Sequence, residues 1–153
     1  MRIRVPLLPG ETVLLKRGAN SVIERADFGL GAMPFDLTAA TRLTGSSRGT
    51  EAVGGHLYVT GMRLVFRSHP INRVRGRYSI LLPEIDSIGD ASSGPVRRVL
   101  VTTEGFRHYF VVWGIPGLIK MVELAQQALG PEEWTALAEL VRRHPDVVAD
   151  TRR

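Results

Sequence analysis

The chain has 153 residues, which at roughly 100 to 200 residues per domain predicts a single domain with one core. It has no cysteine, which excludes disulfides and thiol chemistry, and its hydrophobic share of 44% and charged share of 23% are typical of globular proteins. No run of about 18 apolar residues is present and the first residues lack the form of a signal peptide, so we expect a cytoplasmic protein that does not span a membrane.

The formal net charge is +5, and arginine supplies nearly all of the positive charge, since Lys16 and Lys120 are the only lysines. The charges are unevenly distributed along the chain. Between Glu51 and Glu84 there is no carboxylate. The same stretch contains Arg63, Arg67, Arg73, Arg75 and Arg77. We therefore expect positive potential to be concentrated on this part of the molecule.

The N-terminal part predicts a lead-in followed by two short strands. Residues 1–10 form the lead-in, which ends at Pro9-Gly10. An apolar run at 11–17 is closed by Gly18, and the run at 19–25 has the composition of a second strand.

Periodicity then fails between Asp27 and Val53, where glycine and proline interrupt an apolar segment. Four large apolar side chains occur in this segment within eight positions, namely Phe28, Leu30, Met33 and Phe35. Disordered segments are poor in such residues, and soluble monomers avoid exposing them together. We predict that residues 28–37 form an apolar contact loop, covered by the rest of the domain, by a second copy or by lipid. Whether the whole stretch 28–50 is ordered is left open.

The stretch from Gly55 to Phe66 predicts a tight β-hairpin around Gly61-Met62, with Gly61 at the positive-φ position of a type II′ turn. This turn would place Val59 opposite Leu64, and the rest of the register follows. The predicted core face consists of Leu57, Val59, Leu64 and Phe66. The predicted half-polar surface consists of Tyr58, Thr60, Arg63, Val65 and Arg67.

Further strands are expected at 77–82, which Pro83 ends, and in a second hairpin formed by 96–103 and 106–113 around Glu104-Gly105. In that hairpin Thr103 should face Phe106, and Val99 should face Phe110.

The C-terminal part changes to helical spacing. The first predicted helix follows Pro116, ends at Gly130 and buries Leu118, Val122, Ala125 and Leu129. A second helix begins at Pro131, and its apolar stripe consists of Trp134, Leu137, Ala138 and Val141.

None of the stronger local signatures of catalysis occurs, and the four histidines lie far apart in the sequence, so we expect no enzyme, no cofactor and no metal site. His69 and Asn72 are interpreted as parts of a stabilised turn. Arg63 could contact a phosphate, but a structural role, as a salt bridge or by stacking on an aromatic ring, is the favoured interpretation.

The hairpin Gly55-His56-Leu57-Tyr58-Val59-Thr60-Gly61-Met62-Arg63-Leu64-Val65-Phe66 resembles the signature of the GRAM family, in particular its bacterial members. The Pro83-Glu84-Ile85 segment and the Glu104-Gly105 turn are also similar to that family. The resemblance implies a mainly β protein, with a seven-stranded sandwich or barrel of the pleckstrin-homology (PH) type capped by a helix. This domain would cover 11–130, with 131–153 as an appended helix and tail.

The resemblance also implies a non-catalytic binding module whose partner is an anionic membrane surface or lipid headgroup, with a peripheral location at the inner face of the membrane. The anion-binding candidates are Arg67, Arg73, Arg75 and Arg77, although a solvated basic edge would explain the last three equally well. The alternative is a protein-interaction or self-assembly module that uses residues 28–37 and the C-terminal helix, as a homo-oligomer or with another protein. Nucleic-acid binding is suggested by the pI of about 10.4, but the basic segment has few aromatic residues.

Overall fold

The computed structural model describes residues 2–24, 50–72, 75–148 and 150–152. In this part of the chain, eight strands form one antiparallel sheet in the order β5-β6-β7-β1-β2-β3-β4-β8. The strands are β1 (Val13–Glu24), β2 (Thr50–Thr60), β3 (Arg63–Ser68), β4 (Arg75–Leu81), β5 (Ile85–Asp90), β6 (Arg98–Thr103), β7 (Phe106–Val112) and β8 (Asp150–Arg152). The helices are η2 (Leu82–Glu84), α2 (Ile115–Ala128), α3 (Pro131–Arg143) and α4 (Pro145–Val148). None of these helices is long and apolar enough to cross a membrane.

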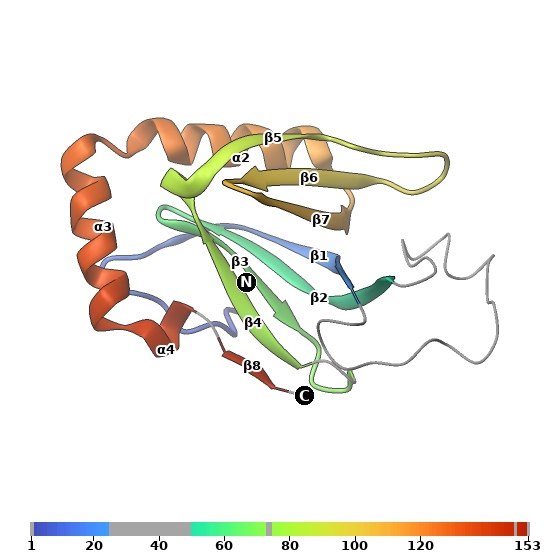
Figure 1. Ribbon diagram of the computed structural model, residues 1–153, viewed down its shortest axis with the longest axis horizontal. Helices are drawn as coiled ribbons and strands as arrows, with labels where there is room; N and C mark the ends of the chain where they lie inside the picture. Colours follow the sequence, from blue (N-terminus) through green and yellow to red (C-terminus); the bar gives the residue numbers. More distant parts are fainter. Residues whose placement is uncertain (1, 25–49, 73–74, 149, 153) are drawn as a thin grey trace.

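The long strand β1 joins two layers of the sheet. It pairs with β2 along nearly its whole length and with β7 from Ala19 to Val22, so the sheet folds over at this strand. Figure 1 shows β5–β7 above and β2–β4 below, with α2 running along the top beside β5. The apolar side of α2 buries Ile115, Leu118, Val122 and Ala125 against buried residues of both layers. The main core therefore lies between the two layers and beneath α2.

The central hairpin has the predicted register: Leu57 lies opposite Phe66 and Val59 opposite Leu64. All four side chains are buried in the main core, as the alternation of the sequence predicted. The second hairpin is also confirmed, because Thr103 pairs with Phe106 and Val99 with Phe110.

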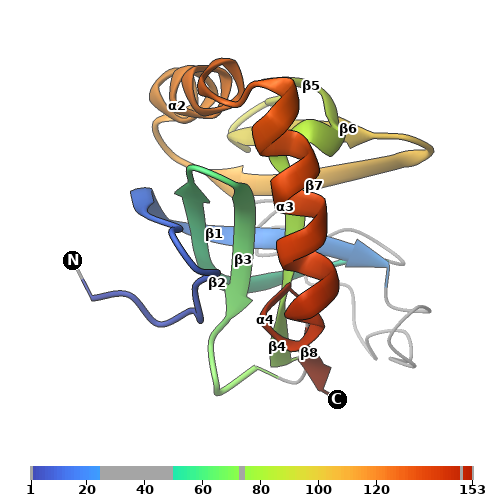
Figure 2. The same ribbon diagram turned by 90° about the vertical axis from the view of Figure 1, so that its left-hand side faces the viewer.

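The other face of the central hairpin differs from the prediction of a half-polar surface. Tyr58 and Val65 are buried on that face, in a second small core that includes Val5. The N-terminal segment crosses this face on the side turned away from β5–β7 (Figure 2). The N-terminal segment is thus packed against the sheet through Val5 and Leu7. The proposed domain boundary after residue 10 stays a prediction.

Two local predictions about glycine were wrong. Gly61 does not take a positive φ. The hairpin is instead closed by the hydroxyl of Thr60, which accepts hydrogen bonds from the backbone N–H groups of Met62 and Arg63. Gly18 does not separate two strands, because β1 runs through it and pairs it with His56.

The C-terminal part forms the two predicted helices and adds α4 and β8, which were not predicted. Strand β8 pairs with β4 and makes an eighth strand beyond the expected seven. On α3, Leu137 is buried while Trp134 is 47% exposed, so the predicted stripe is only partly covered. The predicted contact loop at 28–37 lies outside the described residues.

Leu64→Ala or Phe66→Ala should lower the free energy of unfolding by about 2 to 5 kcal/mol, because each substitution leaves a cavity in the main core. Chemical denaturation measures the change. Phe106→Ala is the control, since this side chain is 68% exposed and its loss should cost less than about 1 kcal/mol. Equal losses for Leu64 and Phe106 would contradict the assignment of faces.

Candidate anion-binding face

Basic side chains gather on the face of β1–β3 that is turned away from the main core. We call this surface the outer basic face; it consists of Arg4, Lys16, His56, Arg67 and His69. The pairing of the strands brings these residues together, because His56 of β2 lies opposite Gly18 of β1 and opposite Arg67 of β3. Lys16 lies two pairs further along β1, opposite Tyr58 and on the same face. The N-terminal segment contributes Arg4, and the turn after β3 contributes His69.

The two histidine rings of this face meet edge to face, with 5.1 Å between the ring centroids of His56 and His69. The ammonium group of Lys16 lies 5.6 Å from the centroid of the Tyr58 ring and donates a hydrogen bond of 2.9 Å to the carbonyl oxygen of Arg2. This bond and the cation–π contact hold Lys16 near the N-terminal segment. The side chains of His56 and Arg67 have no hydrogen bond or ion pair to any described residue, so their donors are open to a ligand.

Two glycines, Gly18 and Gly54, leave the backbone beside His56 without side chains that would project from the surface. A side chain at Gly18 would meet nothing within 4 Å, so the space beside His56 is open. A Cβ atom at Gly54 would lie 3.4 Å from the ring of His69, so the ring packs directly over the backbone there. The outer basic face is therefore a shallow surface that a headgroup or a flat membrane can approach.

The electrostatics of His56 reflect this concentration of positive charge. Its pKa is lowered, chiefly by burial and then by the neighbouring charges of Lys16, His69 and Arg4. Along the three strands of this face no described side chain is a carboxylate. In the segment that covers the face, Glu11 is the acidic residue, and it is buried and already paired with Arg63. The face can thus offer positive charge to an anion without a competing acid.

The four arginines predicted to bind an anion, Arg67, Arg73, Arg75 and Arg77, do not share one environment in the structure. Arg67 lies on the outer basic face. Arg77 lies opposite Arg67 in the sheet, but its guanidinium is turned to α4, where it donates to the carbonyl oxygens of Asp146 and Val147. Arg73 lies outside the described residues, and of Arg75 only the backbone is described, paired with β8. Arg75 and Arg73 remain candidates, as do Phe28, Leu30, Met33 and Phe35 of the undescribed loop.

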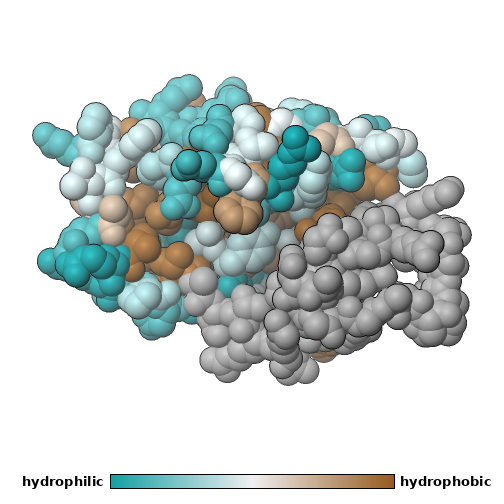
Figure 3. All heavy atoms as spheres, in the orientation of Figure 1, coloured by the Kyte–Doolittle hydropathy of each residue, from teal (hydrophilic) through white to brown (hydrophobic). Residues whose placement is uncertain are grey.

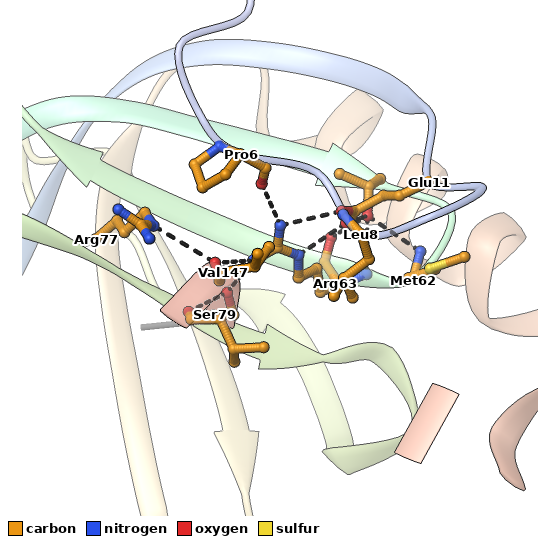
Figure 4. Close-up of polar contacts among 10 residues, drawn as sticks. Pro6, Leu8, Glu11, Met62, Arg63, Arg77, Ser79 and Val147 are labelled. Atoms are coloured by element: carbon orange, nitrogen blue, oxygen red, sulfur yellow. Dashed lines mark hydrogen bonds and ion pairs between the residues drawn. The ribbon is translucent and has the colours of Figure 1, made fainter. Parts of the chain in front are cut away.

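Arg63 is fully buried and has no donor left for a ligand (Figure 4). Its Nε and one terminal nitrogen donate to the two oxygens of Glu11, at 2.8 and 3.0 Å. The remaining N–H groups reach Pro6 O, Ser79 Oγ and Val147 O at 2.6 to 2.9 Å. Because a guanidinium has five N–H donors, every one of them is used. The structural interpretation of Arg63 is confirmed.

The carboxylate of Glu11 is satisfied in the same way. One oxygen accepts hydrogen bonds from Arg63 and from the hydroxyl of Thr60 at 2.7 Å. The other accepts from Arg63 and from the backbone N–H of Leu8 at 2.7 Å. Charge and hydrogen bonds are therefore both balanced within this buried pair, which is the condition for an ion pair to be tolerated in a core.

The remaining polar candidates have structural partners. Asn72 donates from its side chain to the carbonyl oxygen of Gly54 at 2.6 Å, and its backbone N–H reaches His69, as the turn interpretation predicted. His108 lies 3.2 Å from the hydroxyl of Thr103, and burial lowers its pKa. Within the described residues, no three histidine or acidic side chains gather in a way that could hold a metal ion.

Sequence reasoning missed four members of the outer basic face: Arg4, Lys16, His56 and His69. They lie outside the arginine-rich stretch or were interpreted singly, and only the pairing of β1 with β2 brings them together. One signal was available, because His56 and Tyr58 alternate with core residues in the predicted hairpin and must share a face with Arg67.

No protein-family model matches the chain, and a comparison with curated proteins finds no match. Among solved structures, the Vps36 N-terminal PH domain is similar with a TM-score of 0.52 and 11% identity, over 80% of this chain and 83% of that chain. The C-terminal domain of an unknown protein from Leishmania infantum is similar with a TM-score of 0.51 and 17% identity, over 78% and 87% of the two chains. At such identities the likeness shows the fold alone. The fold is PH-like, as the hairpin predicted, while GRAM membership and a bacterial origin stay predictions.

Arg63→Ala should lower the free energy of unfolding by about 3 to 5 kcal/mol, because it leaves the buried carboxylate of Glu11 without its counter-charge. Arg67→Ala is the matched control, since it removes the same side chain from the same strand at a partly exposed position, and should cost no more than about 0.5 kcal/mol. Denaturant titration measures both. Similar small losses for the two variants would contradict the closed network around Arg63.

Proposed function

We propose that this PH-like domain is a non-catalytic binding module that attaches to an anionic membrane surface through its outer basic face. One observation carries the proposal: five basic or protonatable side chains, from the N-terminal segment and from β1, β2, β3 and the turn after β3, converge on one face without an unpaired carboxylate among the described side chains. Each cation near an anionic membrane contributes about 1 kcal/mol. The fixed charges of Arg4, Lys16 and Arg67 would then contribute about 3 kcal/mol, enough for reversible attachment.

The surroundings of the face favour a membrane over a nucleic acid. Two of the exposed apolar side chains, Ile3 and Ile71, belong to the segments that carry Arg4 and His69, and Ile71 is 89% exposed. Apolar side chains beside basic ones suit the headgroup and acyl boundary of a bilayer. Single-stranded nucleic acids are instead bound on exposed aromatic rings, and Tyr58 of this face is buried.

Lys16→Glu combined with Arg67→Glu should abolish binding to phosphatidylserine-containing vesicles, because the charge of the face is reversed. Wild-type binding should be absent on neutral phosphatidylcholine vesicles and should weaken as salt rises. Vesicle sedimentation measures each case. Arg97→Glu combined with Arg107→Glu is the control, since these exposed arginines belong to the β6–β7 layer and carry the same change of charge.

The arginines nominated from the sequence are tested separately by Arg73→Glu with Arg75→Glu. If this pair abolishes binding while the Lys16 and Arg67 variant does not, the contact surface is the segment around Arg73 and Arg75 and not the outer basic face. Binding that survives both pairs and high salt would overturn the electrostatic proposal.

The second candidate function is protein interaction or self-assembly, favoured by incomplete cover around α3. Trp134 is 47% exposed, and Figure 3 shows hydrophobic side chains between α3 and the strands of the lower layer. Such a surface, together with the loop at 28–37, would suit another protein or a second copy.

Deletion of residues 28–37 should distinguish these functions, because each would use the apolar side chains of this loop differently. Conversion of an oligomer to a monomer in light scattering indicates self-assembly, and a selective loss of vesicle binding indicates contact with lipid. A loss of thermal stability indicates that the loop is covered by its own domain. If the deletion changes none of these properties, the prediction of a contact loop is wrong.

A further inference from the structure

His56 occupies the centre of the outer basic face, and its side chain has no hydrogen-bond partner among the described residues. Its neighbours on the sheet are Gly18 on one side and Arg67 on the other. Its ring is 5.1 Å from that of His69 and 6.4 Å from that of Tyr58. The imidazole is thus placed where a bound anion would lie, with its nitrogens available.

Every element packed around His56 presents positive charge to it. The N-terminal segment presents Arg4, β1 presents Lys16, β3 presents Arg67, and the following turn presents His69. No carboxylate among the described groups faces the ring. In the free protein burial, followed by the charges of Lys16, His69 and Arg4, disfavours protonation of His56 and holds its pKa below the ordinary value of 6.5.

We propose that His56 couples membrane attachment to protonation, so that the outer basic face binds anionic headgroups more tightly as the pH falls below neutrality. This inference rests on the proposed function. An anion placed among Lys16, Arg67 and His56 would neutralise the charges that oppose the imidazolium and would accept its N–H groups. Binding therefore favours the protonated ring, and by linkage protonation favours binding, by up to about tenfold per pH unit for one linked proton.

The free protein should show the opposite dependence. Because the pKa of His56 is lower in the folded than in the unfolded state, stability is greatest above pH 6.5 and declines as the pH falls through the lowered pKa. Bound anion reverses this trend, since it raises the pKa of the same group. Lower pH should therefore weaken the folding stability of the free protein but strengthen its binding to anions. This difference separates linkage at the binding face from general acid destabilisation.

The test is vesicle sedimentation at pH 7.5, 6.5 and 5.5 with phosphatidylserine-containing vesicles, for wild type, His56→Gln and His108→Gln. Wild type and His108→Gln should bind about tenfold more tightly at pH 5.5 than at pH 7.5, whereas His56→Gln should bind equally at all three values. His108 is the matched control, because burial lowers its pKa too, but it lies on β7 away from the outer basic face. Circular dichroism at each pH checks that the variants are folded.

Calorimetry of wild type with the same vesicles, in two buffers of different ionisation enthalpy, counts the protons directly and does not depend on any variant. Net uptake of protons on binding near pH 6.5 supports the proposal. Binding without proton uptake, or a pH dependence that His56→Gln retains, overturns the coupling and leaves the proposed function intact. Absence of binding to anionic vesicles at every pH overturns both.

Discussion

The buried pair of Arg63 and Glu11 is the interaction on which the rest of the structure depends. It lies on the side of the hairpin that alternation alone would leave in water, and it is covered because its hydrogen bonds draw other segments over it. The carbonyl oxygen of Pro6 comes from the N-terminal segment and that of Val147 from α4. A charge in this position must be paired on all sides, so the N-terminal segment and α4 are both held against the hairpin.

This arrangement decides which part of the sheet can bind a ligand. Arg63, Arg67 and Arg77 lie on the same face of neighbouring strands, yet they differ in how many donors are already used. Arg63 is saturated, Arg77 is directed to the carbonyl oxygens of α4, and Arg67 is open. Arginines of equal charge therefore differ in how many N–H donors they can offer to a ligand. The open part of the face is centred on His56, beside the segments that carry the two exposed isoleucines.

Much of the fold followed from the sequence, because its evidence is local. The alternation of Leu57 and Val59 with Tyr58 set the register of the central hairpin, and the spacing of Leu118 and Val122 set the buried side of α2.

The predictions failed where contacts distant in sequence decide the outcome. Gly18 was read as a break, but continuous pairing with β2 carries β1 through it. The Gly61 turn takes another form because the Thr60 hydroxyl closes it. The outer basic face joins four separate pieces of chain, so neither composition nor motif could delineate it.

The position of the Arg63 network also has a consequence for how the protein is made. The hydrogen bond from Arg63 to the carbonyl oxygen of Val147 spans 84 residues, and the one to Glu11 spans 52. Contacts this far apart require a large loss of chain entropy before they form. A ribosome releases Glu11 and Arg63 well before residue 147, so during synthesis the guanidinium has incomplete pairing until the last helix emerges. Helix α4 thus completes the burial of a charge that was translated long before it.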